Sequence, residues 1–340
     1  MKVSRRWLWM PFLAPWFAGC RDWQSALEVH GRNARTALSL IWTFTAVSVV
    51  VWVLVMLTLG WALARRRPAA EAARAPLEMD LSRERRLTQL VAGAVAITVI
   101  VLVILTTASF FAGRSIAALT GTEALTVRLT GNQWWWEVRY QDADPADIFT
   151  SADEIHIPAG EAVKVELQSN DVIHSFWVPA LAGKRDLIPG RPSELTIMAD
   201  KPGVYRGQCA EFCGYQHAHM ALIVVAHERK DFEKWRSAQL APAISPANEE
   251  QRRGQQVFMS QGCVMCHTIR GTQAGGTTGP DLTHVASQRG IAANTLPMTR
   301  GALAAWIADP QAIKPGSKMP RVDLNPDDLN AVVAYLGGLK

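Results

Sequence analysis

The chain has 340 residues, of which 49% are hydrophobic, and a formal net charge of +5. This length allows two or three domains. The charge does not favour nucleic-acid binding, because residues 1–113 carry +7, residues 114–240 carry −4 and residues 248–340 carry +2, so most of the excess lies beside apolar segments. The five cysteines form one single residue and two close pairs, which indicates attachment chemistry and metal binding rather than structural disulfides.

Residues 1–20 are typical of a secretory signal peptide. They begin with basic residues, continue with an apolar run over residues 7–18, and end on Gly19-Cys20. The ending Phe-Ala-Gly-Cys resembles a lipoprotein cleavage box, so we expect Cys20 to become the lipidated first residue of the mature chain. Ordinary cleavage, or an uncleaved anchor with an idle thiol, is the alternative.

Two long uncharged runs predict a transmembrane hairpin over residues 21–113. Residues 36–64 and 87–113 contain no charged side chain, and each run exceeds the ~20 residues that cross a bilayer. The loop between them holds seven arginines, and the positive-inside rule places that loop in the cytoplasm. We therefore expect the rest of the chain on the periplasmic or outer side of a bacterial inner (plasma) membrane.

Residues 114–240 show the pattern of an all-β domain. Residues 125–130 and 163–167 alternate between apolar and polar, residues 221–226 form a β-branched run, and Pro-Gly pairs separate such segments. Short strands with these turns favour a sandwich or barrel.

The richest stretch is residues 209–220, which read Cys-Ala-Glu-Phe-Cys-Gly-Tyr-Gln-His-Ala-His-Met. Thiolate, imidazole and thioether are ligands that copper favours. A single blue-copper ion takes one Cys, so a second thiolate indicates a bridge between two copper ions. Such a site needs one more imidazole, and His174 in the segment Asp171-Val-Ile-His-Ser-Phe-Trp-Val-Pro179 offers it.

Two other interpretations of the cysteine pair exist. The pair would form a disulfide in an oxidising compartment, or half of a zinc site. Methionine is a poor zinc ligand, and zinc would leave His174 unexplained. His219 breaks the ligand spacing, so we expect it not to bind metal.

The two stretches resemble the dinuclear copper motif of cytochrome c oxidase subunit II, Cys-x3-Cys-x3-His-x2-Met with an upstream His-Ser-Phe-Trp. The likeness continues through residues 183–191 and 205–208. It implies a cupredoxin fold and a set of copper ligands: Cys209 and Cys213 as bridges, His174 and His217 as caps, Met220 as a weak ligand, and the backbone carbonyl of Glu211. It also implies that the Glu211 carboxylate faces a magnesium ion at the boundary with subunit I.

Three tryptophans follow one another in Gly-Asn-Gln-Trp-Trp-Trp-Glu, and strand alternation puts Trp135 on the opposite face from Trp134 and Trp136. The plain interpretation is sheet core plus one interface ring. The family resemblance is to Gln-Trp-Tyr-Trp, whose first tryptophan lies beside the copper and takes the electron from cytochrome c. It implies that role for Trp134.

Residues 241–247 form a proline-spaced linker before a last domain, residues 248–340. There, Cys263-Val-Met-Cys-His267 is the attachment signature of c-type haem, with thioethers on Cys263 and Cys266 and with His267 as the proximal ligand. A thioredoxin-like redox motif would need a βαβ context that this segment lacks.

The sixth iron ligand should be a distant Met or His. Lys314-Pro-Gly-Ser-Lys-Met-Pro320 resembles the axial-methionine loop of class I cytochromes c, which are all-α, and implies Met319. Met298 is the alternative. We expect His284 to be a surface or packing residue.

The resemblance covers nearly the whole chain and is to subunit II of a caa-type haem–copper oxidase, with a cytochrome c domain fused at its C-terminus. It implies a proton-pumping terminal oxidase. Electrons from a soluble or membrane cytochrome c would pass through haem c and copper to haem a of subunit I, which reduces oxygen to water. Subunit III is a further expected partner. The alternatives are a copper-containing subunit of a nitric oxide reductase and a membrane-tethered carrier without an oxidase partner.

One departure from the family concerns proton uptake. Many members have a Glu in a Trp-Thr-x-x-Pro context near the start of the second membrane helix, whereas residues 82–90 here contain neither Trp nor Pro. Glu78 and Glu84 are therefore left without an assigned role.

Overall fold

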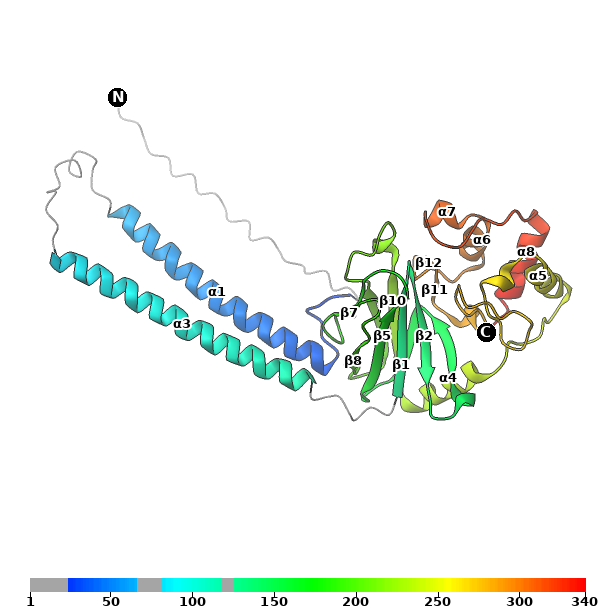
Figure 1. Cartoon of the computed structure of the whole chain (residues 1–340), viewed down its shortest axis with the longest axis horizontal. Coiled ribbons are helices and arrows are strands. Elements are labelled where there is room, and N and C mark those ends of the chain that lie inside the picture. Colours follow the sequence, from blue (N-terminus) through cyan, green and yellow to red (C-terminus); the bar gives the residue numbers. More distant parts are fainter. Residues whose placement is uncertain (1–23, 66–80, 118–124) are drawn as a thin grey trace, which may run out of the picture.

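The computed structural model describes residues 24–65, 81–117 and 125–340 of the chain. Within them, a pair of long helices, a β-sheet domain and a small helical domain follow one another along the longest axis (Figure 1). The expected signal peptide, with Cys20, lies outside the described residues, and so does Glu78.

Two antiparallel helices, α1 (Arg32–Ala64) and α3 (Leu81–Ala117), lie side by side (Figure 1). Their most apolar windows have mean hydropathies of 2.4 and 2.7, and none of either window is buried inside the protein. Such exposure is unfavourable in water, whereas both helices are long enough to cross a bilayer. The pair therefore fits a transmembrane hairpin. Both helices start before the uncharged runs because the basic residues there are good helix formers.

The start of α1 is joined to the β-sheet domain. The Asn33 side chain donates a hydrogen bond of 2.9 Å to the carbonyl of Thr196. At Gly31, a Cβ atom would lie 2.6 Å from the carbonyl oxygens of both Leu181 and Met198, so only glycine permits this approach.

The β-sheet domain consists of two sheets and a hairpin. The larger sheet has the strand order β3-β2-β1-β5-β8, the smaller has the order β4-β10-β9, and β6 pairs with β7. The β1–β5 and β4–β10 pairs are parallel, and the others are antiparallel. The strands are β1 (Leu125–Asn132), β2 (Trp135–Gln141), β3 (Phe149–Ala152), β4 (Glu154–Pro158), β5 (Val163–Ser169), β6 (His174–Phe176), β7 (Arg185–Leu187), β8 (Ser193–Ile197), β9 (Gly203–Gln208) and β10 (Ala221–His227).

The core of this domain follows the strand alternation. Val127, Leu129 and Val165 are fully buried, as every second residue of a half-covered sheet should be. β10 lies in the centre of its sheet and is buried at its first six positions. After β10 the chain forms α4 (Arg229–Leu240), which packs on β4 and β10. The prediction of two membrane-length helices followed by an all-β domain is confirmed.

The C-terminal domain is helical, as predicted, apart from two strands of two residues each. Its elements are α5 (Glu249–Ser260), η3 (Cys263–Met265), η4 (Val285–Ser287), β11 (Gly290–Ile291), β12 (Leu296–Pro297), α6 (Arg300–Ala308), α7 (Pro310–Ile313) and α8 (Pro326–Leu336). α5 crosses α8 so closely that a Cβ atom on Gly254 would lie 1.9 Å from the Ala331 carbonyl oxygen. Phe258 and Tyr335 pack edge to face in the same contact.

Candidate metal centres

The candidate copper ligands come from β6 and from the loop between β9 and β10. His174 is the first residue of β6, Cys209 follows β9 directly, and Met220 directly precedes β10. The Cys209 N–H donates to the Met220 carbonyl at 2.9 Å, and this hydrogen bond holds the two ends of the loop together. His217 lies within the loop, in the short helix η2 (His217–His219). Two paired strands thus hold a ligand-bearing loop in a fixed position.

The soft donor atoms of this loop and of β6 gather at one place. The Cys209 and Cys213 sulfurs are 3.8 Å apart, too far for a disulfide at ~2.05 Å. The His174 Nδ1 atom lies 3.9 Å from the Cys209 sulfur. The Cys213 sulfur lies 3.6 Å from the His217 Nδ1 atom and 3.8 Å from the Met220 sulfur. All of these residues except the half-buried His217 are buried.

The two thiols titrate as a pair. The pKa of Cys209 is lowered to about 4, because Cys213 donates a hydrogen bond to its sulfur and His174 adds a second contact. The pKa of Cys213 is raised by the same contact and by burial. One thiolate is therefore favoured even without a cation, and a bound cation would displace the remaining proton, because the thiolate is the form that binds metal.

A carboxylate outside the cluster orients His174. The His174 Nε2 atom lies 2.9 Å from an Asp171 carboxylate oxygen, which leaves Nδ1 facing Cys209. Metal-binding imidazoles commonly have such a partner on the second nitrogen. The buried soft donors and this outer partner fit copper.

Glu211 and His219 lie at the edge of the cluster. The Glu211 carbonyl oxygen is 3.2 Å from the Cys209 sulfur, whereas its carboxylate pairs with Lys184. The magnesium role of that carboxylate stays a prediction. The exposed His219 ring hydrogen-bonds Gln216 at 2.8 Å, and its contacts among the described residues include no sulfur.

Trp134 lies directly beside the ligand loop. Its indole N–H donates to the Cys213 carbonyl at 3.0 Å, and only 9% of the residue is exposed. Trp136 is fully buried, with its ring 5.9 Å from the His174 ring, and Trp135 is half-buried on the other face. This agrees with the alternation expected from the sequence.

The helical domain orients its attachment motif in a similar way. The Cys263 and Cys266 thiols are unbonded. The His267 Nδ1 atom lies 2.8 Å from the Pro280 carbonyl oxygen, so Nε2 is left for iron. A Cβ atom on Gly279 would lie 2.8 Å from the His267 ring, which shows how tightly the ring is held. This arrangement fits a covalently attached haem.

The two candidate axial methionines differ in their surroundings. Met319 is half-buried, and its carbonyl accepts a hydrogen bond of 2.8 Å from the Gln311 side chain. Met298 packs against the apolar core of the helical domain. His284 is a buried packing residue, with one ring nitrogen 3.0 Å from the Lys340 carbonyl oxygen and the other 3.0 Å from that of Ala241.

Sequence reasoning missed Lys314. This residue of the helical domain is only 2% exposed, and its ammonium group donates to the Trp134 carbonyl at 2.6 Å. No local signal marks it, since a lysine in a Pro-Gly loop is normally exposed to solvent.

Comparison with known proteins gives two family matches. Residues 146–227 match the family described as "Cytochrome C oxidase subunit II, periplasmic domain", and residues 251–340 match "Cytochrome c". The chain is 33% identical to cytochrome c oxidase subunit 2 of Alkalihalophilus pseudofirmus over 100% of this chain and 98% of that protein. It is 30% identical to cytochrome c oxidase subunit 2 of Bacillus subtilis over 64% of this chain and 63% of that protein.

Among solved structures, the periplasmic domain of subunit II of cytochrome oxidase from Bradyrhizobium japonicum matches with 34% identity and a TM-score of 0.32. The match covers 34% of this chain and 94% of that one.

Proposed function

The chain belongs to the cytochrome c oxidase subunit II family, in the form with a fused cytochrome c domain, and we propose that it carries electrons in a fixed order. Electrons from a donor cytochrome c are received by the helical domain, move through a dinuclear copper centre in the β-sheet domain, and leave for haem a of subunit I. That partner reduces oxygen to water and pumps protons.

The observation that carries this proposal is the convergence of five soft side chains on one buried point. His174 comes from β6, and the others come from the β9–β10 loop: Cys209, Cys213, His217 and Met220. Bound copper and haem c supply one-electron redox chemistry. The chain holds the ligand loop between paired strands, excludes water from the thiolates, and fixes the His174 ring through Asp171.

The second part of the proposal concerns the membrane in which the chain lies and the partners, ion and lipid that it binds. The apolar hairpin supports placement in a bacterial inner membrane, with both metal-binding domains on the outer side. Subunit III, magnesium at Glu211 and lipid on Cys20 complete the proposed assembly. The proposed domain limits are those that the sequence predicts: 1–20, 21–113, 114–240, 241–247 and 248–340.

The test is to purify the full chain in detergent, load it with copper, and count copper and covalent haem per chain. Two copper ions that share one unpaired electron in the electron paramagnetic resonance spectrum, beside one haem, are the expected result. A single copper ion, or zinc without a shared electron, would refute the dinuclear centre.

A further inference from the structure

The helical domain buries a positive charge against the β-sheet domain. Lys314 donates to the carbonyl oxygen of Trp134 at 2.6 Å and to that of Ala292, in its own domain, at 3.0 Å. A buried ammonium group is unfavourable unless it is paired and hydrogen-bonded. The groups that stabilise Lys314 therefore come from both domains at once.

The nearby counter-charge is Asp153 of the β-sheet domain, which is 5% exposed. One carboxylate oxygen accepts the Trp136 N–H at 2.8 Å, and the other accepts the Ala293 N–H of the helical domain at 3.1 Å. The Asn294 side chain also donates to the Asp153 carbonyl at 3.1 Å. Asp153 thus accepts hydrogen bonds from a turn of the other domain.

That turn has an unusual backbone. Ala292, Ala293 and Asn294 have φ angles of 55°, 56° and 57°, a left-handed conformation that L-residues with side chains rarely adopt. Ala293 is fully buried, and its carbonyl oxygen accepts a hydrogen bond of 3.3 Å from the N–H of Ala221, the residue after Met220. Residues in such strained conformations persist where the surroundings over-determine them. Here part of the surroundings belongs to the β-sheet domain, through Asp153 and the Ala221 N–H.

A second loop of the helical domain covers Trp134. The Pro315 carbonyl accepts a hydrogen bond of 2.8 Å from the buried Gln216 side chain, and Lys318 pairs with Asp171 at 3.3 Å. A Cβ atom on Gly316 would lie 3.5 Å from the Trp134 ring. The loop that carries Met319 therefore packs directly on the tryptophan beside the copper ligands.

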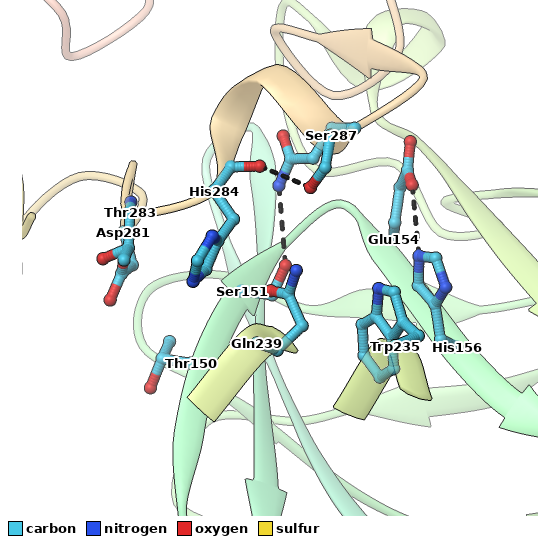
Figure 2. A pocket seen from close by; sticks show the side chains of 11 residues that line it. Thr150, Ser151, Glu154, His156, Trp235, Gln239, Asp281, Thr283, His284 and Ser287 are labelled. Carbon is cyan, nitrogen blue, oxygen red and sulfur yellow. Dashed lines mark hydrogen bonds and ion pairs between the residues drawn. The ribbon is translucent and has the colours of Figure 1, made fainter. Parts of the chain in front are cut away.

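A third contact lies near α4 and η4. Ser287 and His284 of the helical domain line one small cavity together with Ser151 and Glu154 of the β-sheet domain (Figure 2). The cavity between them measures about 10 Å³, the space of about one water molecule. The Arg289 N–H donates to the Glu154 carboxylate at 2.5 Å. The domains thus meet over a packed surface and not only at the linker.

Resting on the proposed function, we propose that Lys314 and Asp153 are positioning residues, which lock the helical domain in one docked position over Trp134. The haem-to-copper step then takes place within a permanent contact. It does not wait for a tethered domain to diffuse into place.

The experiment uses the full chain, loaded with haem and copper, and the variant Lys314→Met, which keeps most of the side-chain volume and removes the charge. Two measurements report whether the helical domain is docked. The first is the zero-length carbodiimide cross-link between Lys318 and Asp171, quantified by peptide mass spectrometry. The second is the rate of copper reduction after photoreduction of the haem, measured with and without sucrose as a viscogen.

In the native chain, the cross-link should form in most molecules and the rate should not change with viscosity. In Lys314→Met, we expect the cross-link yield to fall severalfold and the rate to fall at least tenfold and become dependent on viscosity. Lys230→Met removes an exposed lysine of α4 and is the matched control, with native behaviour expected. A viscosity-dependent rate in the native chain, or a native cross-link yield in Lys314→Met, would refute the proposal that Lys314 holds the helical domain in one docked position.

Asp153→Asn tests the same contact from the other domain, because asparagine tolerates the left-handed backbone of residue 153, where φ is 60°. It should reproduce the Lys314→Met behaviour, and the double variant should lose less than the sum of the two single losses. Additive losses would refute coupling between the two residues. The cross-link needs no copper, so an intact cross-link without electron transfer in the native chain would refute the proposed function and leave the docking in place.

Discussion

The indole N–H of Trp134 donates a hydrogen bond of 3.0 Å to the carbonyl oxygen of Cys213. A conjugated ring surface is thereby joined to the backbone of a residue whose sulfur belongs to the candidate copper site. The other side of the same ring faces Gly316 of the helical domain. Trp134 thus lies between the candidate copper-ligand loop and the loop of the helical domain that carries Met319.

Replacing Trp134 by Phe should slow electron transfer from haem to copper by more than tenfold, because the hydrogen bond to Cys213 is lost and the ring becomes smaller. Copper content should stay at the native level, since no ligand changes. Flash photoreduction of the haem with optical detection of the copper measures the rate. Trp135→Phe, on the opposite face, is the control, and an equal loss of rate there would contradict a specific role for Trp134.

Replacing Cys209 or Cys213 by Ser should abolish the dinuclear centre, because a single remaining thiolate cannot bridge both ions in the same way. Copper analysis and electron paramagnetic resonance would show at most one weakly bound copper ion per chain. His219→Ala should keep both copper ions, since the His219 ring hydrogen-bonds Gln216. A lost copper signal in His219→Ala would show that the ligand set is wrong.

Gly254→Ala should destabilise the helical domain by about 3 kcal/mol, because its Cβ atom would overlap the backbone of Ala331 at 1.9 Å. Denaturant unfolding followed through haem absorbance measures the change. Gly301→Ala adds a methyl group to α6 with nothing within 4 Å and should stay within about 1 kcal/mol of the native chain. Similar effects of the two substitutions would contradict the tight crossing of α5 and α8.

Asp153 should make the stability of the β-sheet domain depend on pH. Burial raises its pKa from 3.8 to about 6, so the folded state binds the proton more tightly than the unfolded state does. The stability from this group is fully present below pH 3.8 and is lost as the pH rises through 6. A shift of about two units corresponds to about 3 kcal/mol.

The stability advantage of the native chain over Asp153→Asn should therefore shrink between pH 4 and pH 6. Denaturant midpoints of both proteins in the same metal state measure this difference. An advantage that grows over this interval would contradict a raised pKa.

Several features could be predicted from the sequence because the signal was local. The candidate ligands Cys209, Cys213, His217 and Met220 lie on one loop, and the candidate haem attachment motif spans five residues. Hydropathy alone located both long helices, although both helices start before the uncharged runs do. His174 needed a further argument, since a distant imidazole joins the cluster only through tertiary contacts. The Ala210 N–H donates to the Ser175 carbonyl at 3.0 Å and holds β6 beside the loop.

The contact between the domains could not be predicted, because it joins residues far apart in the chain. Lys314 and Trp134 are 180 positions apart. The left-handed turn at Ala293 contains no glycine, so its composition does not mark it. The net charges of −4 and +2 on the two domains favour attraction but identify no contact, whereas the structure shows buried hydrogen bonds at Asp153 and Gln216.

Because a loop of the helical domain packs on Trp134, the rate of electron transfer should have a particular dependence on salt. Contacts that are buried are screened little by dissolved ions, whereas the meeting of two separate charged proteins slows as ionic strength rises. The step inside this chain should therefore proceed at the same rate in dilute and in concentrated salt. An external donor, which finds Trp134 covered, would meet the helical domain, and only that encounter would respond to the ionic composition outside the cell.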